Sequence, residues 1–529
     1  MTAARKSSAG AIGIIDIFAG PGGLGEGFSS FECRPGVRPF NLEVSAEMES
    51  SAHATLTLRA FYRLLSQREG RLPKKYLEFL RRYSREDKQT APHIHFGEGP
   101  LSALWKQAEN EALRLTLGVP EHNAILHQHV ASAKRKGNPL VVIGGPPCQA
   151  YSIVGRARNT RDEAFKLHGD KKHFLYREYL EILANYSPDA FIMENVKGIL
   201  TSNVGGRDMF RQIHQDLSHP ARALGINIAK SVSQPEYLLL PVTLNSGEYR
   251  DSEAANKDPT DFVIRCEDHG VPQARHRVII MGIRIDHASK ALKAPGLVTP
   301  EKQATVADAL AGLPRLRSGL SEQFDSEEAW REVVGRQCKL VKRAIGKSDL
   351  KLKEKLESLR LSRLQRSSSH YTGKEPILLQ GIRAKKQDVV LNHETRSHMG
   401  SDLARYLFSS AFAAVHGSSP TSEEFPIELA PDHVNWFSGS FADRFRTQLK
   451  GQPSSTVTSH LSKDGHAFIH FDPSQCRSLT VREAARLQTF SDDYLFLGNR
   501  TQQFVQVGNA VPPMIARQIA AVIWSILGK

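Results

Sequence analysis

The feature that most constrains this chain is an apolar run that ends in a turn of two glycines and two prolines. Residues 139–143 are almost continuously apolar, which is typical of a buried parallel strand. Gly144-Gly145-Pro146-Pro147 ends that strand in a stiff connection, and Cys148 follows directly. Ligands and reactive groups collect at the carboxyl ends of strands in open α/β sheets. The sequence therefore predicts an α/β fold with a thiol held at the edge of its sheet.

Cys148 on its own supports two interpretations. A thiol on a rigid turn is an effective nucleophile when its surroundings favour the thiolate, whereas most free cysteines are small buried core residues. The chain has 5 cysteines without paired spacing. This pattern favours a reducing compartment and gives neither a disulfide framework nor a cysteine metal cluster. The role of Cys148 must therefore be judged from the rest of the chain.

Length and charge indicate the kind of partner. The 529 residues allow two or three domains, and the formal net charge of +14 favours a polyanion, with nucleic acid ahead of a membrane surface. The first ten residues are polar, and Asp16 interrupts the apolar stretch that follows them. We therefore expect neither a signal peptide nor a membrane span there.

A second strand-and-turn unit lies near the start of the chain. Residues 11–18 are apolar and lead into the turn at residues 20–25 (Gly-Pro-Gly-Gly-Leu-Gly), with a helix expected from Glu26 onward. Such a turn suits a nucleotide-type ligand, because the backbone approaches closely and helix N–H groups face it. Glu47, beyond the next apolar run, is placed to hold ribose hydroxyls. A nicotinamide-dependent dehydrogenase would share these features but leaves Cys148 and the charge unexplained.

Two further strand ends carry charged groups. Residues 189–193 predict a buried strand that runs into Glu194-Asn195-Val196, so that a carboxylate would lie beside the Cys148 turn. Strands over 262–264 and 277–283 flank a segment with Arg275 and Arg277. These two arginines point to the same side of an extended chain, and paired guanidiniums suit a phosphate or a base carbonyl.

The remaining segments are predicted to be helical or irregular. Residues 51–138 are interpreted as an inserted helical region whose basic face is solvated surface. In the irregular stretch 288–451, the basic run 336–366 favours phosphate contact. The His-rich stretch 392–398 matches no metal-site pattern. We expect helices over 54–87, 101–117, 174–183, 479–488 and 515–527, and a turn over 506–513.

Taken in order, these motifs resemble those of DNA (cytosine-5) methyltransferases that use S-adenosylmethionine. The match covers about 11–50, 139–285 and 453–529. It rests on Asp16-Ile17-Phe18-Ala19-Gly20-Pro21-Gly22-Gly23, Glu47, Pro146-Pro147-Cys148-Gln149, 170–180, Glu194-Asn195-Val196, Gln273-Ala274-Arg275-His276-Arg277, Arg482-Glu483 and Gly508-Asn509-Ala510-Val511.

The resemblance implies a Rossmann-like S-adenosylmethionine-dependent methyltransferase domain with a mostly parallel central sheet, plus a smaller, irregular target-recognition domain. We expect the catalytic domain over 1–290, with the helical insertion at about 51–138. The target-recognition domain is expected over 291–452. Residues 453–529 would then return to the catalytic domain with the closing motifs.

The resemblance also implies a division of chemical roles. Cys148 would add to carbon 6 of a flipped-out cytosine, and Glu194 would protonate ring nitrogen 3. Arg277 would hold the base carbonyl, with Arg275 nearer the backbone or a phosphate, and the loop 152–172 would close over the base. No metal is expected. The implied cofactor-binding residues are Phe18, Gly20, Gly22, Gly23, Leu24, Glu47, Met48, Pro147, Leu175 and Asn509. The acid that the family places against the adenine ring has no match here.

The expected substrate is double-stranded DNA with a specific target sequence. The expected setting is bacterial modification or phage defence, with a possible genetic association with a restriction system. We expect a monomeric, cytoplasmic prokaryotic protein associated with the nucleoid and without membrane contact. Two alternatives remain: an RNA (tRNA) cytosine-5 methyltransferase, and a non-catalytic DNA-binding regulator of the same fold. A methylation assay on both nucleic acids separates the three.

Overall fold

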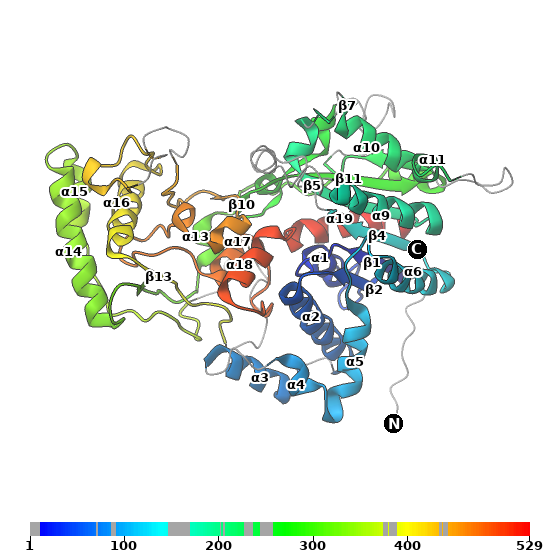
Figure 1. Ribbon diagram of the computed structural model, residues 1–529, viewed down its shortest axis with the longest axis horizontal. Helices are drawn as coiled ribbons and strands as arrows, with labels where there is room; N and C mark the ends of the chain where they lie inside the picture. Colours follow the sequence, from blue (N-terminus) through cyan, green and yellow to red (C-terminus); the bar gives the residue numbers. More distant parts are fainter. Residues whose placement is uncertain are drawn as a thin grey trace.

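The fold is built on one twisted central sheet, seen at the right of Figure 1. The computed structural model describes residues 11–69, 72–85, 91–146, 170–201, 203–204, 207–226, 236–243, 258–373, 379, 389–432, 436 and 443–528. The eight-stranded sheet has the order β3-β2-β1-β4-β5-β11-β8, and β9 also pairs with β11. Its strands are β1 (Ile12–Ile17), β2 (Phe40–Glu47), β3 (Ala112–Arg114), β4 (Leu140–Gly144), β5 (Ala190–Val196), β8 (Tyr237–Leu240), β9 (Val263–Arg265) and β11 (His276–Arg284).

Strand direction divides the sheet into two parts. The strands from β3 to β5 are parallel, whereas β11 runs antiparallel to β5, β8 and β9. All residues of β1 and β4 are buried, as their apolar sequences require when helices cover both faces. Strand order reverses beside β1, which creates a crevice at the carboxyl ends of β1 and β4. The sheet confirms the predicted α/β class.

Helices cover both faces of the sheet. Ile12 and Ile14 face a core shared with α1 (Gly23–Ser30) and α19 (Pro513–Leu527), so that the two ends of the described chain pack together. Ile15 and Ile17 face the opposite core. The helices of that second core are α6 (Pro120–Arg135), α9 (Asp170–Tyr186) and α10 (Met209–Ser218).

The C-terminal segment Arg500–Leu527 has the length and apolarity of a membrane span, but 67% of its apolar window is buried inside the protein. It consists of two helices, α18 (Arg500–Asn509) and α19. The apolar face of α19 is covered by α1 and the sheet, as in the core helix of a globular domain.

The described residues between β2 and β3 form four α-helices. They are α2 (Ser50–Glu69), α3 (Lys74–Arg85), α4 (Pro92–Phe96) and α5 (Ser102–Glu111), and they share an aromatic core with Phe61, Phe96 and Trp105. The helix expected over 54–87 is two helices, because Pro73, directly before the first residue of α3, cannot continue a helix from the preceding segment. The helix expected over 101–117 was wrong beyond Glu111, since β3 pairs with β2 at the sheet edge.

The closing helices differ from expectation at their boundaries. Thr480 caps α17 (Val481–Leu487) in a reciprocal box with Glu483, as its sequence predicts. The turn expected over 506–513 is confined to residues 510–512, because α18 is capped at Asn499 and continues to Asn509. Likewise α1 begins at Gly23, inside the glycine turn and before Glu26.

The region expected to be irregular is largely helical at its far end. Here α14 (Glu327–Ile345), α15 (Leu350–Glu357) and α16 (Gly400–His416) enclose a core with Trp330, Tyr406 and Phe425. These helices lie at the left of Figure 1, away from the central sheet. The 19-residue α14 is amphipathic, so its many cations occupy the face opposite the core.

Candidate active site

A cavity of about 560 Å³ lies where β1, β2, β4 and β5 end. Its wall contains most of the described residues that the sequence singles out: Phe18, Gly20, Gly23, Leu24, Glu47, Met48, Leu175, Glu194, Arg275, Arg277 and Asn509. They come from segments nearly five hundred residues apart and meet only because the sheet brings its strand ends together. One cavity therefore combines a glycine turn, a carboxylate at a strand end, and an acid beside an arginine.

The glycine turn has a backbone that few residues adopt. Phe18, Gly20 and Gly22 have φ values of +56°, +57° and +96°, in the left-handed region. Gly22 caps α1 and does not line the cavity. A Cβ at Gly22 would lie 2.8 Å from the Leu56 Cδ1 atom and 3.0 Å from the Tyr494 hydroxyl. Gly22 therefore allows close packing behind the turn, while Gly20 and Gly23 form the wall.

Glu47 fastens this turn to the end of β2. Its carboxylate accepts hydrogen bonds from the Gly20 amide at 2.8 Å and from the Glu49 amide at 2.7 Å. Burial raises the pKa of the Glu47 carboxyl, and these amides act in the opposite direction. The side chain thus holds the turn and also faces the cavity.

Glu194 and Arg277 form an ion pair on two antiparallel strands. The Arg277 Nε atom lies 3.0 Å from the Glu194 Oε1 atom, and the side chains are 15% and 14% exposed. Arg277 pairs in register with Val196, which makes it the diagonal neighbour of Glu194 on the same face. A Cβ at Gly145 would lie 2.7 Å from the Glu194 Oε2 atom, so the turn after β4 approaches this carboxylate closely.

Arg275 is held differently from Arg277. Its side chain is buried, and its two terminal nitrogens donate to the carbonyls of Val457 at 2.8 Å and Gly508 at 3.1 Å. Both carbonyls belong to the closing part of the chain. Arg275 thus links the segment 273–277 to the backbone just before Asn509. Arg275 also lines the cavity.

Several predicted features lie outside the described residues. These are Pro147, Cys148 and residues 152–169 of the expected closing loop. The described chain lines the cavity up to Gly145 and Pro146, which precede Cys148 by three and two positions in the sequence.

Sequence reasoning missed part of the wall. Leu115 and Leu117 follow β3 and line the cavity near Met48, and Gln506 lines it from α18. The alternation Leu113-Arg114-Leu115-Thr116-Leu117 is a strand signal that could have identified the first two. Gln506 gives no comparable signal, because its placement depends on how α18 packs on α2.

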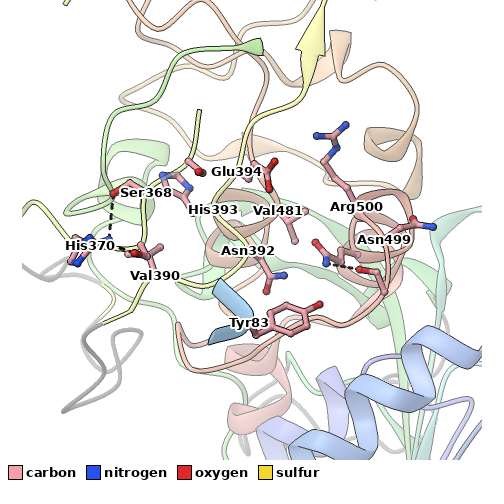
Figure 2. A pocket seen from close by; sticks show the side chains of 14 residues that line it. Tyr83, Ser368, His370, Val390, Asn392, His393, Glu394, Val481, Asn499 and Arg500 are labelled. Carbon is pink, nitrogen blue, oxygen red and sulfur yellow. Dashed lines mark hydrogen bonds between the residues drawn. The ribbon is translucent and has the colours of Figure 1, made fainter. Parts of the chain in front are cut away.

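A second cavity, of about 690 Å³, contains none of the predicted site residues (Figure 2). It is lined by Tyr83 of α3, residues 367–370 and 392–394, and the start of α18. His393 at its edge is buried, with ring nitrogens 2.9 Å from the Thr480 hydroxyl and 3.0 Å from the Pro314 carbonyl. Burial lowers the pKa of His393 to about 4. Within the described chain, no cluster of three or more His, Cys, Asp or Glu could hold a metal ion.

Comparison with known proteins gives consistent matches. The family model described as C-5 cytosine-specific DNA methylase matches residues 122–220 and 261–525. The type II methyltransferase M.Bpa9945I of Bacillus paralicheniformis is 28% identical over 97% of this chain and 99% of its own length. The DNA (cytosine-5-)-methyltransferase M.ApeKI of Aeropyrum pernix is 26% identical, over 73% of this chain and 81% of its own. The matched ranges contain Cys148, Glu194 and Arg277.

Proposed function

The chain belongs to the family of C-5 cytosine-specific DNA methylases, and from this premise we propose how its cavity divides the reaction among its residues. The protein is a DNA cytosine-5 methyltransferase, and methyltransferases of this kind use S-adenosylmethionine as the methyl donor. The observation that carries the proposal is one cavity that holds both the glycine turn with Glu47 and the Glu194–Arg277 pair.

The glycine-turn side of the cavity fits the methyl donor. The Glu47 carboxylate suits ribose hydroxyls, and Met48, Leu115 and Leu117 offer an apolar wall for a purine ring. The donor would supply an electrophilic methyl group at this side. We assign its binding to Phe18, Gly20, Gly23, Leu24, Glu47, Met48, Leu175 and Asn509, with Gly22 shaping the turn and Pro147 added on sequence grounds.

The Glu194–Arg277 side fits the cytosine. The Cys148 thiolate would form a bond to carbon 6, which sends an electron pair into the ring. Glu194 then supplies a proton at ring nitrogen 3, so that carbon 5 becomes nucleophilic enough to take the methyl group. After transfer, loss of the carbon 5 proton to a base expels the Cys148 sulfur and restores the ring. Arg277 would orient Glu194 and hold the base carbonyl, and Arg275 would position this segment from behind.

The substrate is proposed to be duplex DNA at a specific sequence. The reacting carbons are inaccessible inside a base stack, so the cytosine must leave the helix to reach the cavity. We assign recognition to the unit built around α14, α15 and α16, whose exposed cations suit phosphates. The name of the Bacillus relative, a type II methyltransferase, supports a role in restriction-modification.

The decisive test is Cys148→Ser in an assay with tritiated S-adenosylmethionine and DNA that lacks the modification. We expect no detectable transfer, with binding of S-adenosylhomocysteine and DNA retained. Cys338→Ser serves as the matched control, because Cys338 is a half-buried thiol on α14 away from the cavity. Full activity of Cys148→Ser would end the proposal, and transfer to tRNA but not DNA would favour the RNA alternative.

A further inference from the structure

Behind the glycine turn lies a buried cluster of charges, and its two arginines belong to the basic face of 51–138 that was expected to be solvated surface. Arg59 and Arg63 on α2 point inward, toward Glu26 of α1, Glu111 of α5 and Asp493 after α17. All five side chains are at most 14% exposed. Ions removed from water in this way are costly unless each one is paired. The arrangement of the pairs therefore decides what the cluster does.

Arg59 is at the centre of the cluster. Its Nε and Nη2 atoms donate to the two carboxylate oxygens of Glu26, at 2.9 and 2.5 Å. Its Nη1 atom lies 3.3 Å from the Asp493 Oδ1 atom. The guanidinium also lies 4.0 Å from the centre of the Tyr62 ring and 4.7 Å from that of Tyr494. This fork-to-carboxylate geometry fixes the Glu26 side chain in one orientation.

Glu26 connects the cluster to the turn. It lies in the first turn of α1, whose first residue, Gly23, is part of the cavity wall. On the other side of Arg59, the Tyr494 hydroxyl donates a hydrogen bond to the Pro21 carbonyl. Leu56 of α2 packs where a Cβ at Gly22 would be. Helix α2 and Tyr494 therefore support the left-handed turn from behind, and the guanidinium of Arg59, on α2, lies against the Tyr494 ring.

Helix α2 also supports the opposite wall of the cavity, which α18 forms. The Gln506 side chain, which lines the cavity from α18, donates to the Ser51 hydroxyl at 3.0 Å and accepts from the Thr55 hydroxyl at 2.7 Å. Ala52 and Glu49, at the start of α2, line the cavity themselves. One helix therefore spans the space between the glycine turn and the helix that carries Asn509.

We propose that α2 is the supporting wall of the methyl-donor site and that Arg59 is a positioning residue for the glycine turn. Arg59 does not line the cavity and acts through Glu26 and Tyr494. Without it, the Glu26 and Asp493 carboxylates would remain buried, with Arg63 at 4.0 Å as the nearest remaining cation of Glu26. The start of α1 would then shift to reach water, and the turn would lose its donor-binding shape. This inference rests on the proposed placement of S-adenosylmethionine at that turn.

The test compares Arg59→Met with Arg405→Met. Arg405 forms an ion pair of similar burial with Asp402 on α16, at 3.0 Å, far from the cavity. We expect Arg59→Met to raise the KM for S-adenosylmethionine and the Kd for S-adenosylhomocysteine at least tenfold, with the KM for DNA changed less than threefold. Arg405→Met should lower the melting temperature and leave the Kd for S-adenosylhomocysteine, measured without DNA, unchanged. Equal effects of the two variants on donor affinity would overturn the proposal.

A second pair of variants covers the case in which Arg59→Met does not fold. Arg59→Lys keeps the charge but loses the fork, so we expect an intermediate rise in the donor KM, and a wild-type KM would overturn the proposal. Adding Glu26→Gln to Arg59→Met removes an unpaired charge and should recover part of the donor affinity. If the wild-type protein fails to bind S-adenosylhomocysteine in calorimetry, the donor-site assignment is wrong, which is distinct from a failure confined to the Arg59 variants.

Discussion

The closing part of the chain and the α14–α15 helices use cationic residues in opposite ways. Arg477, Arg482 and Arg486 are among the largest fully buried side chains of the molecule. On α14 and α15, by contrast, Arg336, Lys339, Arg343 and Lys355 are exposed, and none has an ion pair within 4.0 Å in the described chain. A single net charge for the whole chain hides this difference. Only the second group is available to a polyanion.

The buried arginines each have a structural partner. Arg477 makes two bonds to the Glu483 carboxylate, at 2.6 and 2.7 Å, and Arg486 makes two to Asp492. Arg482 donates to three backbone carbonyls. Because a buried guanidinium is favourable only when its donors are satisfied, these residues fix the backbone of the closing segment around α17. The buried arginines therefore hold the fold together, whereas the exposed cations of α14 and α15 can attract a polyanionic substrate.

The largest effect is expected at Glu194, which belongs to a buried ion pair and is also the proposed general acid. Glu194→Gln keeps the shape beside Arg277 but has no proton to give to ring nitrogen 3. We expect turnover to fall about a hundredfold or more, the usual contribution of a general acid. Binding of S-adenosylhomocysteine and thermal stability should stay close to wild type. Single-turnover kinetics with tritiated donor would measure this, and a rate within a few-fold of wild type would remove Glu194 from the mechanism.

A smaller effect is expected from the exposed cations. Replacing Lys339, Arg343 and Lys355 by glutamine should weaken DNA binding about tenfold and reduce the slope of log K against log salt by about one per lost phosphate contact. Turnover at saturating DNA should not change. Fluorescence anisotropy at several salt concentrations measures the slope.

The matched control for those cations replaces Lys290, Lys293 and Lys302 by glutamine. These three lysines are exposed outside α14 and α15, and their replacement changes the net charge equally. If both triple variants lose the same affinity, the effect is overall charge, and α14–α15 is not the phosphate-binding surface.

Local patterns predicted the strands and the residues at their ends. The apolar runs of β1, β4 and β5 identified the sheet, and Glu47, Glu194 and Arg277 followed from their positions at strand ends. The prediction that failed most clearly involves partners distant in sequence. The α2 arginines have an amphipathic pattern that resembles a solvated face, but one acid of their cluster is Asp493, which also bonds Tyr62 from 431 residues away. The edge strand β3 was predicted as the end of a helix, although residues 113–117 alternate as in a strand, and its pairing with β2 decides between the two.

The last prediction concerns stability and not the reaction, and it involves Asp16, a buried acid without an ion pair in the described part of the chain. Burial raises the pKa of Asp16 to about 8, although Arg63 acts to lower it. The folded protein therefore keeps a proton on Asp16 at neutral pH that the unfolded chain releases near its ordinary pKa. Stability is then largest at low pH and falls as the pH rises toward 8, with a slope of at most about 1.4 kcal/mol per pH unit.

Asp16→Asn cannot ionise, so this slope should be absent from the variant between pH 6 and 8. Urea unfolding at pH 6, 7 and 8 measures the free energy of unfolding of both proteins. The value for the variant minus that for the wild type should increase as the pH rises. Glu483 offers the opposite case. Burial would raise its pKa, but the charge and hydrogen bonds of Arg477, together with His470 and His393, lower the pKa below the ordinary value. Glu483→Gln should therefore change the pH dependence only on the acid side, where the pair loses its charge. For the Asp16 prediction, parallel curves of stability against pH for the wild type and Asp16→Asn would be the contrary result. They would show that Asp16 is ionised in the folded protein, with Arg63 as an effective partner.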